Sequence, residues 1–245
     1  MDIRKGHPDK AVVVDLDGTL LHYEPESYII KGRSRDCYLS GKTVELLAEI
    51  SQRLPTFIAT GRNAFSVEKI TNQLTKVHFA GFVLENGFIV KTDISSTNQH
   101  KRKWRFADKV PVDWEPILGY ESSVGFILPN RYENPAALVQ QLLKETQENG
   151  YVCHQHPKIF IYPQMPDKML GLAQFNVEPY ISLGNDLNDM QLLQKSTHSV
   201  TLSTACPEIQ EIVKGKNGYC SPFTAHAAAE DMLRWAYAKL ADHHS

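Results

Sequence analysis

The sequence lacks several features that would point to particular classes of protein. Its formal net charge is only −2, from 26 basic and 28 acidic residues, so no charge imbalance suggests binding to nucleic acid or to a membrane surface. No apolar run reaches the length that spans a bilayer. The N-terminal stretch MDIRKGHPDK is polar and has no apolar signal-peptide core, and we therefore expect a cytoplasmic protein.

Cysteine is also scarce, and internal repeats and low-complexity linkers are absent. The four cysteines show no CxxC spacing; they are Cys37, Cys153, Cys206 and Cys220. We expect reduced, structural cysteines rather than a disulfide framework or a zinc site. What remains is an ordinary globular composition of 245 residues, 42% hydrophobic and 22% charged. This length allows one large domain or a domain that carries a second, inserted one.

Apolar and polar segments alternate in the first third of the chain. The continuous apolar run AVVVDL is typical of a central parallel strand that is covered on both faces. A helix-like segment follows at 41–54 and a second strand at 55–63. A second helix-like segment at 64–77 and a third strand at 81–87 come next. Because crossovers between parallel strands are right-handed, this order predicts a doubly wound α/β sheet. The polar segment 22–40 contains proline and glycine, and we expect it to form a long loop or flap.

The middle of the chain breaks this alternation. This part suggests a mixed α+β segment. Its strand-like stretches are FIVKTD and SVGFILPN, its helical stretch is PAALVQQLLKETQENG, and a possible hairpin is formed by YVCHQ and KIFIYPQ. The alternating pattern returns from DKMLGLAQF and continues to a closing helix, AAAEDMLRWAYAKL. We therefore predict a Rossmann-like core made of residues 1–87 and 162–245, with a smaller inserted α+β cap at 88–161.

Two acidic residues end the first apolar strand. Side chains alternate in an extended chain, so Asp15 and Asp17 point the same way. They would lie at the carboxyl end of the strand, where open α/β sheets bind ligands. A hard divalent cation such as Mg²⁺ would relieve their mutual repulsion and could hold a phosphate. For this stretch alone, the simpler alternative is a surface turn at the Asp-Gly dipeptide.

Polar residues also follow other predicted strands. ATGRN places Thr60 and Arg62 after the second strand, where a hydroxyl and turn N–H groups can hold phosphoryl oxygens. DKMLG places Lys168 at a helix start, and LGNDLND ends a later strand with Asn185, Asp186 and Asp189. Taken singly, these residues are typical of a helix cap, a solvated lysine and a surface turn.

Taken together and in order, DLDGTLL, ATGR, LENG, DKMLGL and GNDLNDMQLL resemble the haloacid dehalogenase superfamily of phosphatases. The branch is the one with a cap inserted after the third core strand, which includes Cof-like and sucrose-phosphate phosphatase-like enzymes. The resemblance implies that Asp15 is a nucleophile that forms an aspartyl phosphate and that Asp17 is the general acid and base. It also implies phosphate binding by Thr60, Gly61, Arg62 and Lys168.

The resemblance further implies a Mg²⁺ site. Its ligands would come from Asp15, from Asp17 and from the GNDLND loop, with Asp189 beside them. The family's commoner pattern in this loop is Gly-Asp-x-x-Asn-Asp, whereas Asn185 stands here at the usual carboxylate position and Asp186 follows it. Either Asn185 binds the metal through its amide oxygen or Asp186 replaces it, and the sequence leaves both open.

The implied function is a Mg²⁺-dependent phosphatase that acts on a small phosphorylated metabolite such as a sugar phosphate, because a closing cap admits small substrates. The alternatives are a phosphomutase of the same superfamily and a non-catalytic phospho-ligand-binding protein. We expect no nucleic-acid or membrane partner, and the sequence carries no signal of oligomeric state. We interpret KRKWRF (101–106) as a solvated face with packed aromatic rings, or else a substrate contact. We interpret His154 and His156 as exposed hairpin residues rather than a metal pair.

Overall fold

A computed structural model describes residues 9–32, 35–96 and 101–242. The larger unit, which we call the core, has a sheet of seven strands: β1 (Asp9–Val14), β4 (Thr56–Ala59), β5 (Phe79–Leu84), β6 (Ile89–Lys91), β11 (Val177–Leu183), β12 (His198–Leu202) and β13 (Tyr219–Ser221). Its helices are α1 (Gly41–Ser51), α2 (Ala64–Thr71), α4 (Lys168–Leu172), α5 (Met190–Lys195), α6 (Pro207–Gly215) and α7 (Ala225–Asp242). Three short 3₁₀ turns complete it: η1 (Glu85–Gly87), η3 (Ala173–Phe175) and η4 (Leu187–Asp189).

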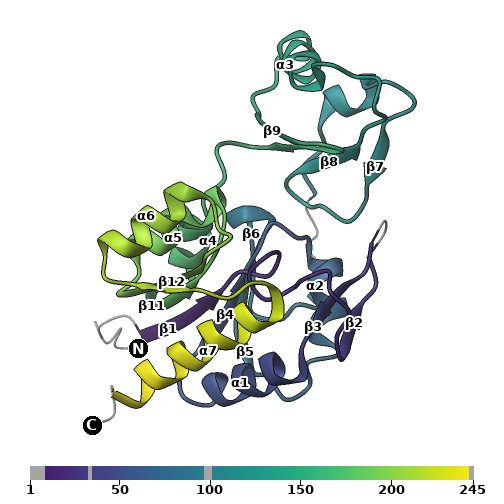
Figure 1. Cartoon of the computed structure of the whole chain (residues 1–245). Helices are drawn as coiled ribbons and strands as arrows, with labels where there is room; N and C mark the ends of the chain where they lie inside the picture. The colour runs from purple at the N-terminus through teal and green to yellow at the C-terminus, as the bar shows by residue number, and fades with distance from the viewer. Residues whose placement is uncertain (1–8, 33–34, 97–100, 243–245) are drawn as a thin grey trace.

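The core sheet has the strand order β13-β12-β11-β1-β4-β5-β6 (Figure 1). All neighbouring strands are parallel except β5 and β6. The strand order reverses at β1, which pairs with β4 on one side and β11 on the other. The predicted doubly wound α/β architecture is therefore confirmed.

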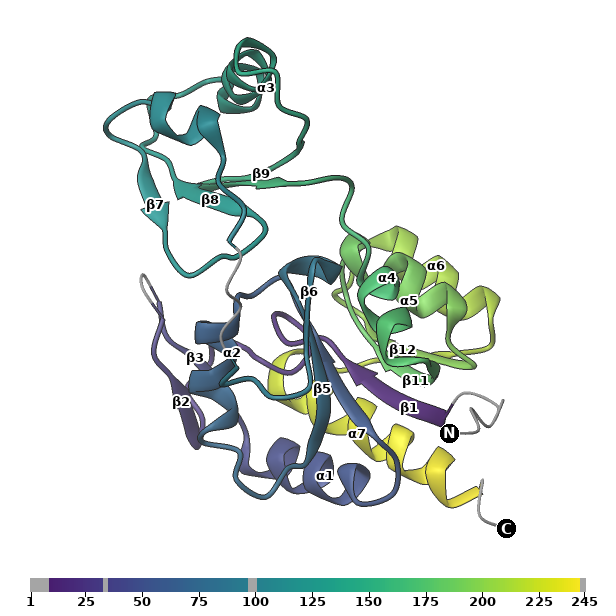
Figure 2. The same ribbon diagram turned by 180° about the vertical axis from the view of Figure 1, so that it is seen from behind.

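The apolar run of β1 explains its central position. Val12 and Val14 belong to a buried cluster that also contains residues of α1 and α7. Ala11 and Val13 point to the opposite face and pack in a second cluster, which includes Leu172 of α4 and Leu192 of α5. Seen from behind, α1 and α7 lie along one face of the sheet and α4 lies on the other (Figure 2). A strand buried on both faces needs apolar side chains at every position, as AVVV provides.

The smaller unit, which we call the cap unit, has a four-stranded antiparallel sheet of order β7-β8-β10-β9. Its elements are η2 (Arg105–Lys109), β7 (Glu115–Ile117), β8 (Val124–Ile127), α3 (Pro135–Glu145), β9 (Tyr151–Gln155) and β10 (Lys158–Tyr162). β9 and β10 pair as the hairpin that we predicted. Trp104 and Phe106 of KRKWRF are buried in the cluster that joins α3 to this sheet, while its basic side chains are exposed, as the packed-aromatic interpretation expects.

One strand lies outside its predicted unit. We expected FIVKTD inside the inserted cap, which we began at residue 88, but Ile89–Lys91 forms β6 at the edge of the core sheet. Glu85, Asn86 and Gly87 all have positive φ, so the chain reverses directly after β5. This tight turn brings β6 back antiparallel to β5, and the prediction that the cap begins at 88 is wrong for this strand.

The polar segment 22–40 is more ordered than a loop. It contains a short hairpin of β2 (Tyr28–Ile30) and β3 (Cys37–Leu39). A further bridge joins His22 to Tyr38, so the segment folds back on the chain that follows Asp17. We also did not predict α6 and β13, which add a helix and an edge strand after β12. Within the described residues, no helix is both long enough and apolar enough to cross a membrane.

Candidate active site

The predicted site residues converge at one edge of the core sheet. Asp15 and Asp17 follow β1, Thr60 follows β4, and Asn185 follows β11. Because β1 lies between β4 and β11 and the three strands are parallel, their carboxyl ends meet. Lys168 reaches the same edge from the first residue of α4. The fold thus brings together motifs that are far apart in the sequence.

Lys168 lies at the centre of this arrangement and is completely buried. Its Nζ donates to Asp15 Oδ1 at 2.7 Å and to Asp189 Oδ1 at 2.5 Å. Asp167 caps α4 by accepting the Met169 N–H at 2.8 Å, which fixes the start of this helix. Burial lowers the pKa of Lys168, but the two carboxylates more than offset this and raise it above its ordinary value. Lys168 is therefore a buried cation held between two acids.

Both oxygens of Asp15 are engaged. Oδ1 accepts from Lys168, and Oδ2 accepts the Thr19 hydroxyl at 3.0 Å. The side chain is almost fully buried, and this burial raises the pKa of Asp15 to about 7 against the opposing charge of Lys168, while Asp189 raises it further. The carboxylate is thus held in one orientation and largely shielded from water.

Asp189 holds Lys168 and the loop after β11 together by hydrogen bonds. Its Oδ1 accepts from Lys168, and its Oδ2 accepts the backbone N–H groups of Asn185 at 3.0 Å and Asp186 at 3.2 Å. The preceding Gly184 leaves room for this carboxylate, since a Cβ there would lie 2.6 Å from Asp189 Cγ. Asp189 therefore ties the loop after β11 to Lys168, beside the predicted metal ligands.

The two candidate ligands of this loop point in different directions. Asn185 Oδ1 lies 3.0 Å from the Thr19 hydroxyl, which also lies 3.0 Å from Asp15 Oδ2. Asp186 instead accepts the Leu187 N–H at 2.7 Å and caps η4. The amide oxygen of Asn185, and not the carboxylate of Asp186, thus faces Asp15.

These donors fit a hard divalent cation. Carboxylate and amide oxygens are ligands that Mg²⁺ accepts, together with water and substrate phosphate. Among the described residues, no three acidic, histidine or cysteine side chains converge as a metal site. An ion at this edge would therefore depend on Asp15, on the neutral oxygen of Asn185 and on backbone, water or phosphate oxygens.

Asp17 forms a bidentate ion pair with Arg62. Arg62 Nε donates to Asp17 Oδ2 at 2.8 Å and Nη2 donates to Oδ1 at 2.6 Å. Burial raises the pKa of Asp17, but the hydrogen bonds and charge of Arg62 outweigh it and leave the pKa below its ordinary value. The Asp17 side chain is 53% exposed, so it faces the space in front of the sheet. The predicted phosphate ligand Arg62 is here a partner of the predicted acid and base.

The loop after β4 is fixed by its backbone. Thr60 is fully buried; its N–H donates to Val83 O at 2.8 Å, and its hydroxyl accepts the Arg62 N–H at 3.2 Å. Gly61 O accepts the hydroxyl of Tyr120 from the cap unit at 3.3 Å. Phosphate binding by Thr60, Gly61 and Arg62 stays a prediction, and the structure adds a contact with the cap unit.

Sequence reasoning missed the role of Asn86. Its Nδ2 donates to the Tyr162 hydroxyl of the cap unit at 3.0 Å, and its Oδ1 accepts from Asn188 Nδ2 at 3.1 Å. Its own N–H donates to Thr60 O at 3.0 Å. Asn86 thus connects β10 with the loops that follow β4 and β11. The available signal was the Glu-Asn-Gly tripeptide, which is typical of a turn with positive φ.

Glu85 also joins the two units. One of its carboxylate oxygens accepts the N–H of Glu121 at 2.6 Å, and the other accepts those of Ser122 at 3.0 Å and Ser123 at 2.8 Å. A buried ion pair between Lys91 and Glu121, 3.2 Å long, lies in the same junction. Nothing in the sequence pattern distinguishes these residues from exposed charges.

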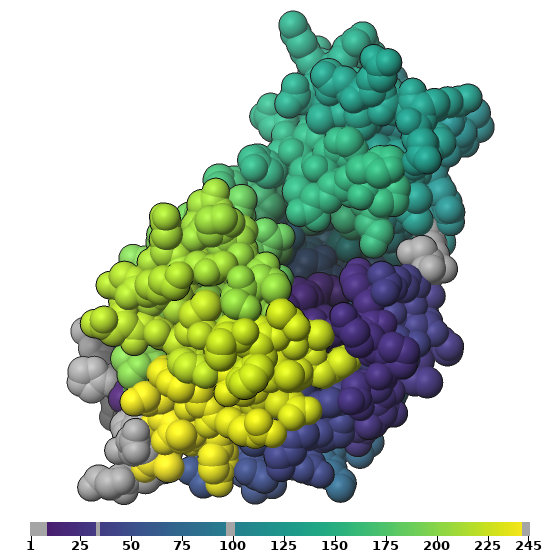
Figure 3. Space-filling model, viewed as in Figure 1, coloured from purple at the N-terminus to yellow at the C-terminus, as the bar shows by residue number. Residues whose placement is uncertain are grey.

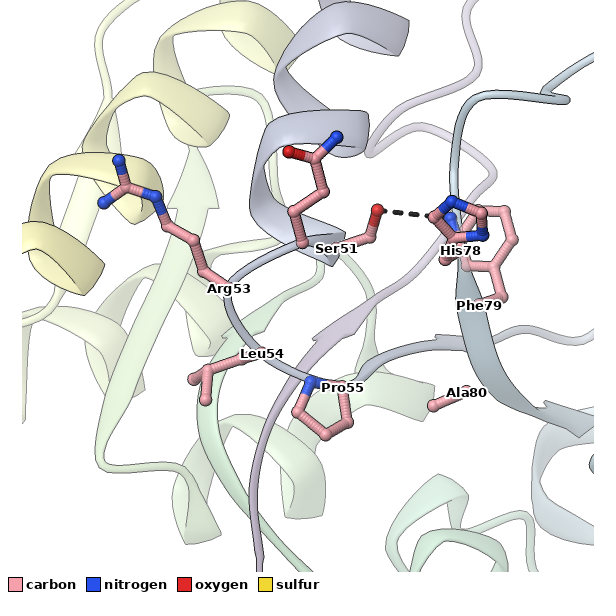
Figure 4. Close-up of a pocket in the computed structure, with 8 residues that line it drawn as sticks. Ser51, Arg53, Leu54, Pro55, His78, Phe79 and Ala80 are labelled. Carbon is pink, nitrogen blue, oxygen red and sulfur yellow. Dashed lines mark hydrogen bonds between the residues drawn. The ribbon is translucent and has the colours of Figure 1, made fainter.

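A shallow hollow lies at the opposite end of the sheet (Figure 4). It is lined by Pro55 and His78, which precede β4 and β5, and by Ser51, whose Oγ accepts the His78 N–H at 3.1 Å. These residues lie at the amino ends of the strands. The hollow is therefore separate from the predicted site, whose residues lie at the carboxyl ends.

Comparison with known proteins agrees with this geometry. Residues 12–113 match the family model of haloacid dehalogenase-like hydrolases. A haloacid dehalogenase-like hydrolase from Bacteroides thetaiotaomicron has a similar structure, with a TM-score of 0.66, 16% identity, and coverage of 95% of this chain and 99% of that chain. No curated protein sequence matches the chain significantly.

Two phosphatase structures are similar over nearly their whole length. The sucrose-phosphatase of Synechocystis sp., solved with sucrose and phosphate, has a TM-score of 0.62 at 16% identity and covers 96% of this chain and 98% of its own. A haloalkanoate dehalogenase superfamily phosphatase from Bacteroides thetaiotaomicron has a TM-score of 0.64 at 15% identity, with 97% and 98% covered. At these identities the likeness establishes the fold, and the family match contains Asp15, Asp17 and Thr60. The match of residues 12–113 and the shared fold support the resemblance to haloacid dehalogenase-like hydrolases that the sequence motifs indicate.

Proposed function

We propose that this protein is a Mg²⁺-dependent phosphatase that releases inorganic phosphate from a small phosphorylated metabolite, such as a sugar phosphate. The observation that carries the proposal is the buried series Asp15–Lys168–Asp189 at the carboxyl end of β1. Burying a lysine and two carboxylates costs several kcal/mol per ion before pairing, so such groups contribute little net stability. Buried charges with shifted pKa values, at the ligand-binding edge of an α/β sheet, are typical of a catalytic site.

In the first half-reaction, a carboxylate oxygen of Asp15 attacks the phosphorus atom of the substrate. The bond between phosphorus and the leaving oxygen breaks, and Asp17 gives that oxygen a proton. The product is an aspartyl phosphate on Asp15 and a free alcohol. Lys168 holds Asp15 in position and places a fixed positive charge next to the phosphoryl group.

In the second half-reaction, Asp17 accepts a proton from a water molecule, which attacks the phosphorus atom. The bond between phosphorus and Asp15 breaks. Inorganic phosphate is released, and the free Asp15 carboxylate is regenerated. The pair with Arg62 keeps Asp17 ionised, which suits the second step, whereas the first step requires Asp17 to leave this pair and carry a proton. Proton transfer by such a placed group typically contributes a factor of about 10²–10⁴.

The site would hold Mg²⁺ through Asp15 and the Asn185 amide oxygen, with the backbone carbonyl of Asp17 as a third candidate. When bound, the ion would offset the repulsion between the Asp15 carboxylate and the anionic phosphate. Thr19 Oγ1 lies 3.0 Å from an oxygen of each side chain and can donate its single proton to one of them at a time.

The test is phosphate release from an aryl phosphate, with and without Mg²⁺. We expect steady release by the wild type and its loss when Mg²⁺ is chelated. Asp15→Asn should lower the rate by at least about a thousandfold, because an amide cannot replace the attacking carboxylate. Asp108→Asn, at an exposed aspartate of η2, is the matched control and should keep the wild-type rate.

Each alternative function gives a different result in this assay. A phosphomutase would not release phosphate steadily, and a non-catalytic binding protein would release none. Wild-type turnover by Asp15→Asn would contradict the proposed role of Asp15.

A further inference from the structure

The sheet of the cap unit has two different faces. Opposed residues in antiparallel strands share a face, and successive residues alternate. Ile159 and Ile161 of β10 lie on the face that is buried against α3. Lys158, Phe160 and Tyr162 therefore share the other face, together with their β9 partners Gln155, Cys153 and Tyr151.

This second face points toward the core. The Phe160 ring lies 5.4 Å from the ring of Tyr120, whose hydroxyl donates to Gly61 O. On its other side, Phe160 stacks at 6.2 Å on Tyr162, whose hydroxyl accepts from Asn86. Both flanking rings are thus bonded to loops of the candidate site. The surface is hollowed between the cap unit and the core on the side seen in Figure 3.

A glycine sets the position of Phe160. Gly125 of β8 lies directly opposite Phe160 in the sheet, and a Cβ on it would come within 2.5 Å of the Phe160 ring. The ring therefore lies against the backbone of β8. Phe160 is half-buried, so part of its surface stays exposed.

Lys158 adds a positive charge to the same face. It is exposed, and within the described residues its ammonium makes no hydrogen bond or ion pair. Lys158 lies two residues before Phe160 in β10, so it is on the face of the sheet that points toward the core. The one acidic residue on this face of the sheet, Glu115, is two strands away from Lys158.

The basic run KRKWRF does not share this position. Its aromatic residues Trp104 and Phe106 pack in the cluster on the α3 side of the sheet. Phe106 and Arg105 also donate their backbone N–H groups to Glu148, at 2.8 and 3.0 Å, which fastens the run to the segment after α3. Among the strands of the cap sheet, the cation on the face toward the core is therefore Lys158.

Resting on the phosphatase function above, we propose that Lys158 and Phe160 form the subsite for the leaving group. We propose that it selects phosphomonoesters whose alcohol part carries a second anionic group, either a carboxylate or another phosphate. The carbon skeleton would lie over the Phe160 ring, and the anionic group would pair with the Lys158 ammonium. A neutral sugar phosphate would leave that ammonium without a partner.

The test compares two matched pairs of esters: phosphoglycerate with glycerol phosphate, and fructose bisphosphate with fructose monophosphate. The members of the first pair differ by a carboxylate and those of the second by a phosphate, so the pairs separate the two sources of charge. For at least one pair, we expect the wild-type kcat/KM to be about tenfold higher for the more anionic ester. Lys158→Gln should reduce this ratio to less than about threefold, mainly through KM.

Two further variants sharpen the result. Lys144→Gln, at an exposed lysine of α3 on the far side of the sheet, is the matched control and should keep the wild-type ratio. Phe160→Leu should raise KM for both members of a pair by a similar factor, because the ring contacts carbon and not charge. A selective change in the ratio by Phe160→Leu would contradict the assignment.

Two more outcomes overturn the inference while the proposed function stands: a wild type that shows no preference in either pair, and a preference that survives Lys158→Gln. Failure of the proposed function itself is distinct, because the wild type would then release no phosphate from the aryl phosphate or from any of the four esters. That outcome would overturn both proposals.

Discussion

The charged groups of the core site and those of the facing cap surface are held in opposite ways. In the core, Lys168 is completely buried between Asp15 and Asp189. On the cap unit, Lys158 is exposed and makes no ion pair within the described part of the chain. The paired charges around Lys168 suit the phosphoryl group, which is the same in every phosphomonoester. The exposed charge of Lys158 suits the alcohol part of the substrate, which differs from one ester to another.

At the junction between the two units, the polar groups are buried and paired, as they are in the core site and unlike Lys158 on the cap surface. Glu85 accepts three backbone N–H groups from the cap unit, and Asn86 bonds to Tyr162. The two units are thus connected by buried, satisfied polar groups. The following predictions test how far this difference between paired and open charges extends, from the largest expected effect to the smallest.

Lys168→Met should have the largest effect. It leaves Asp15 and Asp189 as two buried carboxylates without a cation, which typically costs about 3 kcal/mol or more in the free energy of unfolding. Phosphate release should fall by at least about a hundredfold. Urea denaturation and the phosphate assay measure the two effects.

The matched control is Lys144→Met, at an exposed lysine of α3, which should change stability by less than about 0.5 kcal/mol. If Lys168→Met were as stable and as active as this control, the buried series would have neither role.

Glu85→Gln should destabilise the junction. Both carboxylate oxygens accept N–H groups, whereas an amide has one acceptor oxygen, so at least one donor of the cap unit loses its partner. The expected loss in the free energy of unfolding is about 2 kcal/mol. Glu133→Gln, at an exposed position before α3, is the control and should have almost no effect. Equal denaturation curves for the two variants would contradict the junction as described.

His22 should make the core sensitive to mild acid. Burial lowers the pKa of His22, and the neighbouring His226 ring, 5.2 Å away, lowers it further. Below the ordinary histidine pKa of about 6.5, the unfolded chain therefore binds a proton that the folded protein does not. Stability should fall as the pH decreases below about 6.5, by at most about 1.4 kcal/mol per pH unit.

The measurement is the free energy of unfolding between about pH 7.5 and 5.5. His22→Asn should reduce the acid-induced loss, whereas His78→Asn, at an exposed histidine, should keep it. A steeper loss in His22→Asn than in the wild type would show that the sign is wrong.

Arg62→Lys should cause the smallest change in stability. The pair with Asp17 is bidentate, but Asp17 is half-exposed, and such pairs contribute less than about 1 kcal/mol. A lysine cannot reproduce the two parallel hydrogen bonds, so kcat should fall by about tenfold while the denaturation midpoint hardly moves. A large loss of stability with unchanged kcat would place Arg62 among the structural residues.

The sequence predicts the central strands of the core because they are apolar. AVVVDL, PYISLG and HSVTL are covered on both faces, so their composition shows that they are buried strands. The site residues follow from this, since the parallel strands bring their carboxyl ends to one edge. The burial of Lys168 could not be predicted, because a lysine at a helix start is usually solvated.

The missed features depend on contacts between segments rather than on local pattern. β6 is a three-residue strand that exists because the turn at Glu85–Gly87 returns it to β5. The direction in which Lys158 points depends on the register of β10 with β8 and β9. For KRKWRF, the sequence predicts packed rings, but only the structure shows that they fill the far side of the cap sheet.

The most direct test of the central claim is to find the phosphoryl group on Asp15. The wild type is mixed with Mg²⁺ and an aryl phosphate, quenched in acid during steady turnover, digested at low pH, and mapped by mass spectrometry. The proposed function predicts one added phosphoryl group on the peptide that contains Asp15, and its loss when the substrate is exhausted before quenching. Steady phosphate release with the phosphoryl group on another residue would contradict the assignment of Asp15 as the nucleophile.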